Sequence, residues 1–197
     1  MRIATTFLLL SFAGLAAYAQ NSDLALLAGV SNAKTTEVVL GSKISVSGSR
    51  TNTFQVNYAR QFLSTKAGDL YVEFPVCWGT NAVVDVGNNV SVFGRNILFF
   101  TPGVRYRISL QRRLSLYGAG GIGVATFGIG SVLATNEALV PSWTTSGAAD
   151  LAAGLDFRLT RLLSLRTELR DYITSPNRGG VAARNHVIYQ WGVSFHF

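Results

Sequence analysis

The sequence predicts an all-β fold, an eight-stranded antiparallel up-and-down transmembrane β-barrel, and three observations lead to this class. The chain opens with a segment of the kind that directs export. It is 48% hydrophobic and only 14% charged, whereas globular domains average about 25% charged residues. After the opening segment, apolar and polar residues alternate with a period of two, which predicts strands with two different faces.

Residues 1–19 have the layout of a signal peptide. Arg2 supplies positive charge, an apolar run follows from Phe7 to Ala17, and Ala17-Tyr18-Ala19 matches the small-x-small cleavage pattern. The apolar run is shorter than the roughly 20 residues of a membrane-spanning helix. We therefore expect a signal peptide at residues 1–19 and one exported domain at residues 20–197.

No later stretch approaches a run of about 18 apolar residues, so the exported domain is not predicted to span a membrane with helices. An apolar exported chain of this kind needs another way to satisfy its backbone in lipid. A closed barrel is the other spanning structure that does so. The predicted location is the bacterial outer membrane.

The last strand shows the alternation most clearly. Its apolar positions alternate with Gln190, Gly192, Ser194 and His196. In a membrane barrel the apolar face contacts lipid and the polar face lines the lumen. The same pattern recurs along the chain, and the eight predicted strands cover residues 24–31, 54–59, 70–78, 98–109, 114–127, 150–159, 163–170 and 187–197.

The connections alternate in length. They are short at residues 64–69, 111–113 and 160–161, and long at residues 80–96, 128–142 and 175–184. Outer-membrane barrels have short periplasmic turns and long external loops. The first strand is expected to pair with the last and close the barrel.

Two pairs of residues disturb this pattern. Pro75 and Pro102 lack the N–H group that a sheet ladder uses, so we expect a bulge or a hydrogen-bond gap at each. Phe99 and Phe127 fall on the lumen parity, which indicates a register change or strands that have left the membrane.

Two segments carry motifs beyond this pattern. The penultimate strand reads Leu165-Arg166-Thr167-Glu168-Leu169-Arg170, and residues 117–123 are rich in glycine. With the terminal Phe197, they resemble the outer-membrane β-barrel domain family that includes the small OmpA-like and OmpX-like barrels. The resemblance implies insertion by the barrel assembly machinery, with the last strand as its recognition signal. The residues of that signal would be Tyr189, Trp191, Val193, Phe195 and Phe197.

Nine charged residues fall on the lumen parity, four acids and five bases. They are Glu73, Arg105, Arg107, Asp150, Asp156, Arg158, Arg166, Glu168 and Arg170. An eight-stranded barrel is just wide enough for side chains to fill it, and a buried charge without a partner costs several kcal/mol. We therefore expect a charge network that plugs the lumen. The small residues around it, such as Gly118, Gly120, Ala152 and Gly154, make room for the arginines and also leave open a narrow water path.

The family resemblance implies no single activity, since such barrels serve as anchors, adhesins, pores or lipid-modifying enzymes. We expect a structural or surface-interaction role with a plugged lumen, and a narrow porin-like channel is the alternative. A lipid A-modifying hydrolase is less favoured. Deacylase barrels of similar size carry His and Ser two residues apart on one face. Here the residue two positions after His186 is Ile188, and Ser194, two positions before His196, is expected near the periplasmic end, away from surface lipid.

No motif for a metal, a cofactor or a nucleic acid is present. Cys77, the single cysteine, is expected to be a small buried side chain. The expected partners are outer-membrane lipid and lipopolysaccharide, the barrel assembly machinery, and an extracellular ligand of the long loops. Lys66, Arg112, Arg113 and Arg161 lie in the short turns, where they are solvated or contact anionic headgroups.

Overall fold

The computed structural model of the chain describes residues 21–39, 42–81, 84–86, 90–92, 95–129, 142–175 and 185–197. The expected signal peptide lies outside the described residues. No helix among the described residues is long and apolar enough to cross a membrane. The strands are β1 (Ser22–Val39), β2 (Ser42–Ser64), β3 (Asp69–Asn81), β4 (Val84–Val86), β5 (Val90–Val92), β6 (Arg95–Phe100), β7 (Gly103–Ser109), β8 (Leu114–Ile129), β9 (Ser142–Arg158), β10 (Leu163–Thr174) and β11 (Asn185–His196).

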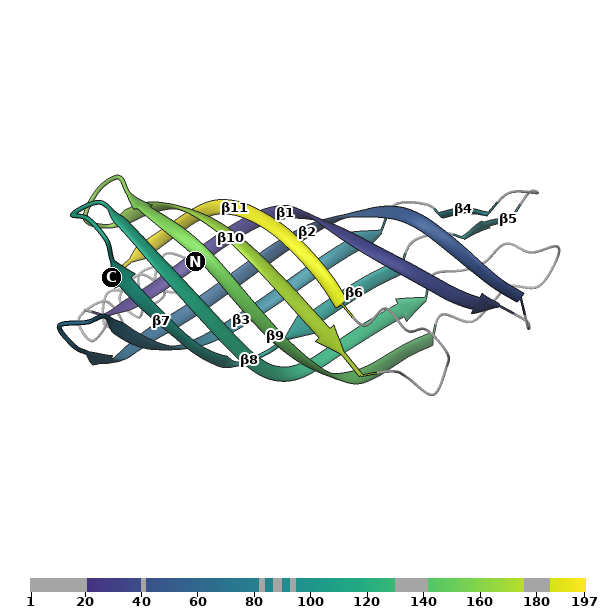
Figure 1. Cartoon of the computed structure of the whole chain (residues 1–197), viewed down its shortest axis with the longest axis horizontal. Coiled ribbons are helices and arrows are strands. Elements are labelled where there is room, and N and C mark those ends of the chain that lie inside the picture. The colour runs from purple at the N-terminus through teal and green to yellow at the C-terminus, as the bar shows by residue number, and fades with distance from the viewer. Residues whose placement is uncertain are drawn as a thin grey trace, which may run out of the picture.

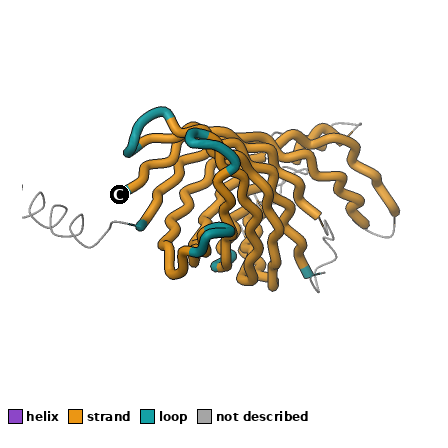
Figure 2. The backbone as a smooth tube through the Cα atoms, turned by 60° about the vertical axis from the view of Figure 1, so that its left-hand side comes forward, coloured by secondary structure: helices purple, strands orange, loops and turns teal. Residues whose placement is uncertain are grey.

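Antiparallel pairing joins all of these strands except β4 and β5 into one closed wall (Figure 1). β6 and β7 both pair with β3 on one side and with β8 on the other, so they are two halves of one barrel strand. The described barrel thus has eight strands, which confirms the predicted fold class. The predicted closure is also confirmed, because β1 pairs with β11 from Asp23↔His196 to Asn32↔Val187. Figure 2 shows how completely strands make up the described backbone.

Both prolines lie at one interruption of the wall. The fourth barrel strand breaks at Thr101 and Pro102. Phe74 and Pro75 lie opposite this break on β3, and they pair with β2 but not with the fourth strand. The register is the same on both sides of the break, so no residue is inserted. The predicted bulge or gap is therefore a single two-residue gap shared by the two prolines. The Pro102 carbonyl still accepts a hydrogen bond of 3.1 Å from the Ile122 amide.

The two faces of the wall differ in polarity, as β10 shows best. Its burial alternates along the whole strand, with Leu165 and Leu169 outside, 47% and 43% exposed, and Arg166 and Arg170 inside, both 0% exposed. Such large exposed apolar side chains cover the outer face on every side. They include Phe54, Val56, Trp78, Leu98, Val104, Leu116, Ile122, Leu151, Leu155 and Trp191. This surface is suited to lipid, and the interior is polar.

The short connections are tight turns at the end of the barrel where β1 begins and β11 ends (Figure 1). The Thr65 amide donates to the Gly68 carbonyl, and the Thr160 amide donates to the Leu163 carbonyl. The Thr160 hydroxyl also accepts from the Leu163 amide at 3.1 Å, so a side chain completes that turn. We call this the turn end and the opposite one the loop end. Much of the long connections at residues 128–142 and 175–184 lies outside the described residues.

At the loop end β1 and β2 continue past the barrel as a two-stranded ribbon. Beyond Asn32, β1 no longer pairs with β11, and before Thr51, β2 no longer pairs with β3. The two strands still pair with each other as far as Val39↔Ser42. The connection at residues 80–96 holds a second short hairpin, β4–β5. The sequence pattern predicted neither hairpin.

Candidate functional site

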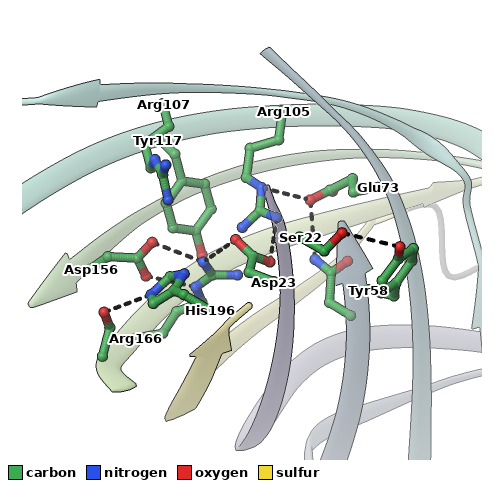
Figure 3. Close-up of polar contacts among 12 residues, drawn as sticks. Ser22, Asp23, Tyr58, Glu73, Arg105, Arg107, Tyr117, Asp156, Arg166 and His196 are labelled. Atoms are coloured by element: carbon green, nitrogen blue, oxygen red, sulfur yellow. Dashed lines mark hydrogen bonds and ion pairs between the residues drawn. The ribbon is translucent and has the colours of Figure 1, made fainter. Parts of the chain in front are cut away.

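The interior of the barrel is the candidate site, because it holds the buried charges. Nearest the turn end, Asp23 accepts from Arg105 Nη2 at 2.8 Å and from Arg166 Nη2 at 3.3 Å. Asp156 accepts from Arg166 Nε at 2.6 Å and from Nη2 at 2.8 Å, a bidentate pair. Figure 3 shows these four side chains, with Tyr117 beside them. We call Asp23, Arg105, Asp156 and Arg166 the lower ion layer.

The next layer is centred on Arg170. Its guanidinium donates to Glu73 Oε1 and to Glu168 Oε1, both at 2.8 Å, and to Asp150. Glu73 also lies 3.4 Å from Arg105 Nε, which connects this group to the lower ion layer. We call Glu73, Asp150, Glu168 and Arg170 the upper ion layer.

Neutral polar side chains complete the upper ion layer. Glu168 accepts from Gln55 Nε2 at 2.9 Å and from the Tyr117 hydroxyl at 2.8 Å. Glu73 accepts from Asn57 at 3.1 Å, and the Tyr172 hydroxyl donates to Gln55 at 3.2 Å. A carboxylate that accepts several hydrogen bonds tolerates burial because its lone pairs are satisfied.

Above the ion layers the interior becomes apolar. The Phe99 ring stacks on Tyr172 with the ring centroids 4.1 Å apart, and it meets Phe127 edge-on at 6.3 Å. His186 lies 5.4 Å from Phe99 between ring centroids. We call the buried residues of this level the apolar layer, and they are Cys77, Ile97, Phe99, Ala125, Phe127, Ala148, Tyr172 and Ile188.

This layer corrects one expectation from the sequence. Phe99 and Phe127 were expected to mark a register change or strands beyond the membrane. The register change is wrong, because β6 and β8 pair in continuous register from Arg95↔Ile129 to Phe100↔Val124, and both rings point inward. The alternation of inward and outward residues is intact, and the interior changes from charged side chains to apolar ones at this level. Cys77 is buried, and its sulfur lies 3.7 Å from Gln190 Nε2.

Of the nine charged residues expected in the lumen, seven lie in the two ion layers. Arg107 lies at the turn end, 12% exposed, and its Nη2 is 3.3 Å from Asp69. Arg158 is exposed and makes no ion pair within the described part of the chain, so it was wrong to expect it in the buried network. It is the last residue of β9, and its side chain lines a pocket at the turn end instead of entering the two ion layers.

Sequence reasoning missed Asp23, which bridges two arginines. It precedes the predicted strand at residues 24–31, so it was not assigned to a face, although it continues the parity of Ala25 and Leu27. With Asp23 included, the described interior buries five carboxylates against three guanidinium groups. Gly118 and Gly120 do not make room for the arginines as expected, because they stand on the outward parity, whereas Gly154 is inside.

A serine–histidine pair also escaped the sequence search. Ser164 Oγ and His196 Nε2 are 2.7 Å apart, and they come from neighbouring strands rather than from one strand. Ser164 is only 1% exposed.

The outward residues of β11 form an apolar row next to lipid. Tyr189, Trp191, Phe195 and Phe197 are 41–58% exposed, and Val193 is partly buried. The residues that the family resemblance implies for assembly therefore share the outer face of the last strand.

No protein-family model matches the chain, and no curated protein matches it. Solved structures do. The attachment invasion locus protein Ail of Yersinia pestis matches with a TM-score of 0.52 and 10% identity, over 90% of this chain and 99% of that one. Neisserial surface protein A matches with a TM-score of 0.58 and 12% identity, over 88% and 97%. The outer membrane enzyme PagL matches with a TM-score of 0.51 and 15% identity, over 88% and 100%.

At such identities the likeness shows the fold and leaves the role open, since these neighbours include a surface protein and an enzyme. The closed wall, the apolar outer face and the short turns at one end agree with that fold. The chain is an eight-stranded outer-membrane β-barrel, with the architecture of the small OmpA-like and OmpX-like barrels.

Proposed function

We propose that the protein is a non-conducting, non-enzymatic outer-membrane barrel whose loop end serves a surface interaction. The observation that supports a closed lumen is that three successive levels of the interior are filled by side chains. Two levels consist of ion pairs, and the third is apolar. A permeating ion would have to displace carboxylates and guanidinium groups from each other. Separating a buried pair costs about 3–5 kcal/mol.

The apolar layer adds a second barrier of a different kind. Its stacked Phe99 and Tyr172 rings offer a passing ion little to replace its water, and hydrophobic constrictions in pores close by dewetting. The two barriers lie in series, so opening one leaves the other in place.

Planar-bilayer recording of the purified protein tests the closed lumen. We expect no stepwise conductance at moderate voltage. The alternative is the narrow porin-like channel, and discrete conductance steps would establish it. Because buried carboxylates outnumber buried guanidinium groups, a channel through this interior would select cations over anions.

The surface role is supported by the β1–β2 ribbon and the β4–β5 hairpin, which extend the loop end beyond the wall. Residues 32–50 contain Lys34, Lys43 and Arg50 but a single acid, Glu37. A basic projecting segment is suited to an anionic ligand. Ail has been crystallised with the heparin analogue sucrose octasulfate, which supplies a probe.

The test compares the intact protein with a variant in which a two-residue turn replaces residues 34–48. Sucrose octasulfate should bind the intact barrel in detergent and bind the shortened one at least several-fold more weakly. Equal binding by both would show that the ribbon is not the ligand surface.

The Ser164–His196 pair does not favour an enzyme. A nucleophile must reach its substrate, and the nearly complete burial of Ser164 prevents this. Purified protein incubated with lipid A should leave its acyl chains intact. Deacylation that is lost in Ser164→Ala would overturn the proposal.

A further inference from the structure

A pocket of about 330 Å³ lies at the turn end, below the lower ion layer. Segments far apart in the chain form it, and each supplies a residue that lies at the turn end. Arg107 comes from β7, Arg158 ends β9, Arg161 lies in the β9–β10 turn, and His196 ends β11. The pocket is distinct from the plug, because Asp23 is the only ion-layer residue in its lining.

The charge of this pocket is opposite to that of the interior above it. Three guanidinium groups line it, and the described acid in the lining is Asp23. The Asp23 carboxylate is already engaged by Arg105 and Arg166. It therefore does little to neutralise the three arginines of the mouth.

Two of these arginines have guanidinium N–H groups that are available to a ligand. Arg158 and Arg161 are exposed, and neither forms an ion pair with any residue that the structure describes. Arg107 stacks on the Tyr71 ring at 4.6 Å and shares Asp69 with Gln61 and Ser64.

We propose that the turn-side mouth binds a phosphate group, either inorganic phosphate or the phosphate of an anionic phospholipid in the periplasmic leaflet. Guanidinium groups bind tetrahedral oxyanions through paired N–H donors, so converging arginines favour phosphate over a monatomic anion. The volume is at the small end of ligand sites, which suits one phosphate with a few attached atoms. Exposed Phe197, also in the lining, places the pocket at the lipid boundary.

The experiment uses protein purified from outer membranes in a zwitterionic detergent. The broadening of the ³¹P NMR signal of inorganic phosphate measures binding of the free ion. Native mass spectrometry of protein exchanged with phosphatidylglycerol, and with phosphatidylcholine as the neutral comparison, measures binding of the lipid. The test variant is Arg158→Gln/Arg161→Gln.

Its control is Lys66→Gln/Arg112→Gln, which removes the same net charge from exposed turn residues outside the pocket. If the mouth binds phosphate, the test variant loses on the order of tenfold in affinity for each arginine, and the control stays near the parent. Loss in the NMR arm identifies free phosphate as the ligand, and loss confined to the lipid arm identifies the headgroup. Equal losses in test and control variants, or no binding by the parent in either arm, would overturn the proposal.

Discussion

Single residues in the interior are fixed by the need to satisfy buried charge. Glu168 illustrates this, since Arg170, Gln55 and Tyr117 all donate to its carboxylate. The position of the Tyr117 ring in turn depends on Gly154, which has no side chain. A Cβ at Gly154 would lie 2.3 Å from the Tyr117 hydroxyl and 2.6 Å from the Thr167 carbonyl.

Removal of the Glu168 carboxylate tests the ion layers. Glu168→Ala should lower the free energy of unfolding by roughly 3–5 kcal/mol, because Arg170 and Tyr117 lose a buried acceptor. Urea unfolding in lipid vesicles measures this change. Thr167→Ala, an exposed neighbour on the same strand, should change stability much less. Similar losses for both variants would contradict the burial argument.

Two glycines of β9 provide a matched comparison. Gly154→Ala should cost about 1–3 kcal/mol by overpacking, because Tyr117 must shift away from Glu168. Gly147→Ala on the outward face should be nearly neutral, since nothing lies within 4 Å of its added Cβ. Thermal unfolding of the two variants side by side checks the difference. An unchanged Gly154→Ala protein would mean that the Tyr117 position is not constrained.

At the scale of elements, each strand contributes one face to lipid and one to the plug. β10 carries most of the interior, since Arg166, Glu168, Arg170 and Tyr172 supply both ion layers and the apolar layer in turn. β11 contributes an apolar outer face and, on the inside, the buried side chains of His186, Ile188 and Gln190. Past Asn32 on β1 and before Thr51 on β2, the ribbon pairs with no third strand that the structure describes, so it adds nothing to the closure of the barrel.

Deletion of Phe197 separates packing from assembly. Burial of its ring contributes at most ~3 kcal/mol to the stability of the folded barrel. The refolded variant should therefore keep its heat-modifiable mobility. Levels in the outer membrane of cells should fall much further if β11 is the assembly signal. Equal losses in the two assays would mean that Phe197 acts through packing alone.

Shortening the ribbon should leave the barrel intact. With residues 34–48 replaced by a tight turn, the urea midpoint should stay within the error of the parent, because the described part of the removed backbone pairs only with itself. A clear drop in the midpoint would show that the ribbon supports the wall.

On the scale of the whole molecule, the interior of the barrel has two barriers in series, and the charge of the pocket at the turn end is opposite to that of the interior. Ion pairs close the half nearer the turn end, and stacked rings close the half nearer the loop end. The interior carries a surplus of carboxylates, whereas the turn end carries a surplus of arginines.

The series arrangement has a measurable consequence. Phe99→Ala/Tyr172→Ala should stay silent in planar bilayers, because the ion layers below remain closed. The variant is also expected to be less stable, by several kcal/mol for two buried rings, so folded protein must be selected by its mobility before recording. Conductance by this variant would show that the ion layers alone do not block ions.

The sequence by itself determined the eight strands, the closure of the first strand on the last and the face of nearly every side chain. Period-two alternation is a local property, and each segment reveals it without its neighbours. The expected signal peptide and the absence of a second long apolar run then led to the prediction that the apolar face meets lipid. Seven of the nine charges expected inside were assigned to the ion layers by parity alone.

Only the tertiary structure decided which charges meet. Asp23 and Arg166 are far apart in the chain, and their contact depends on the register across three strands. The same holds for Ser164 with His196, and for the arginines that converge at the mouth from separate strand ends. Parity gives the face of a residue but not its height in the barrel, and height is fixed by the stagger of the closed wall. That is why Arg158, on the correct face, lies outside the network.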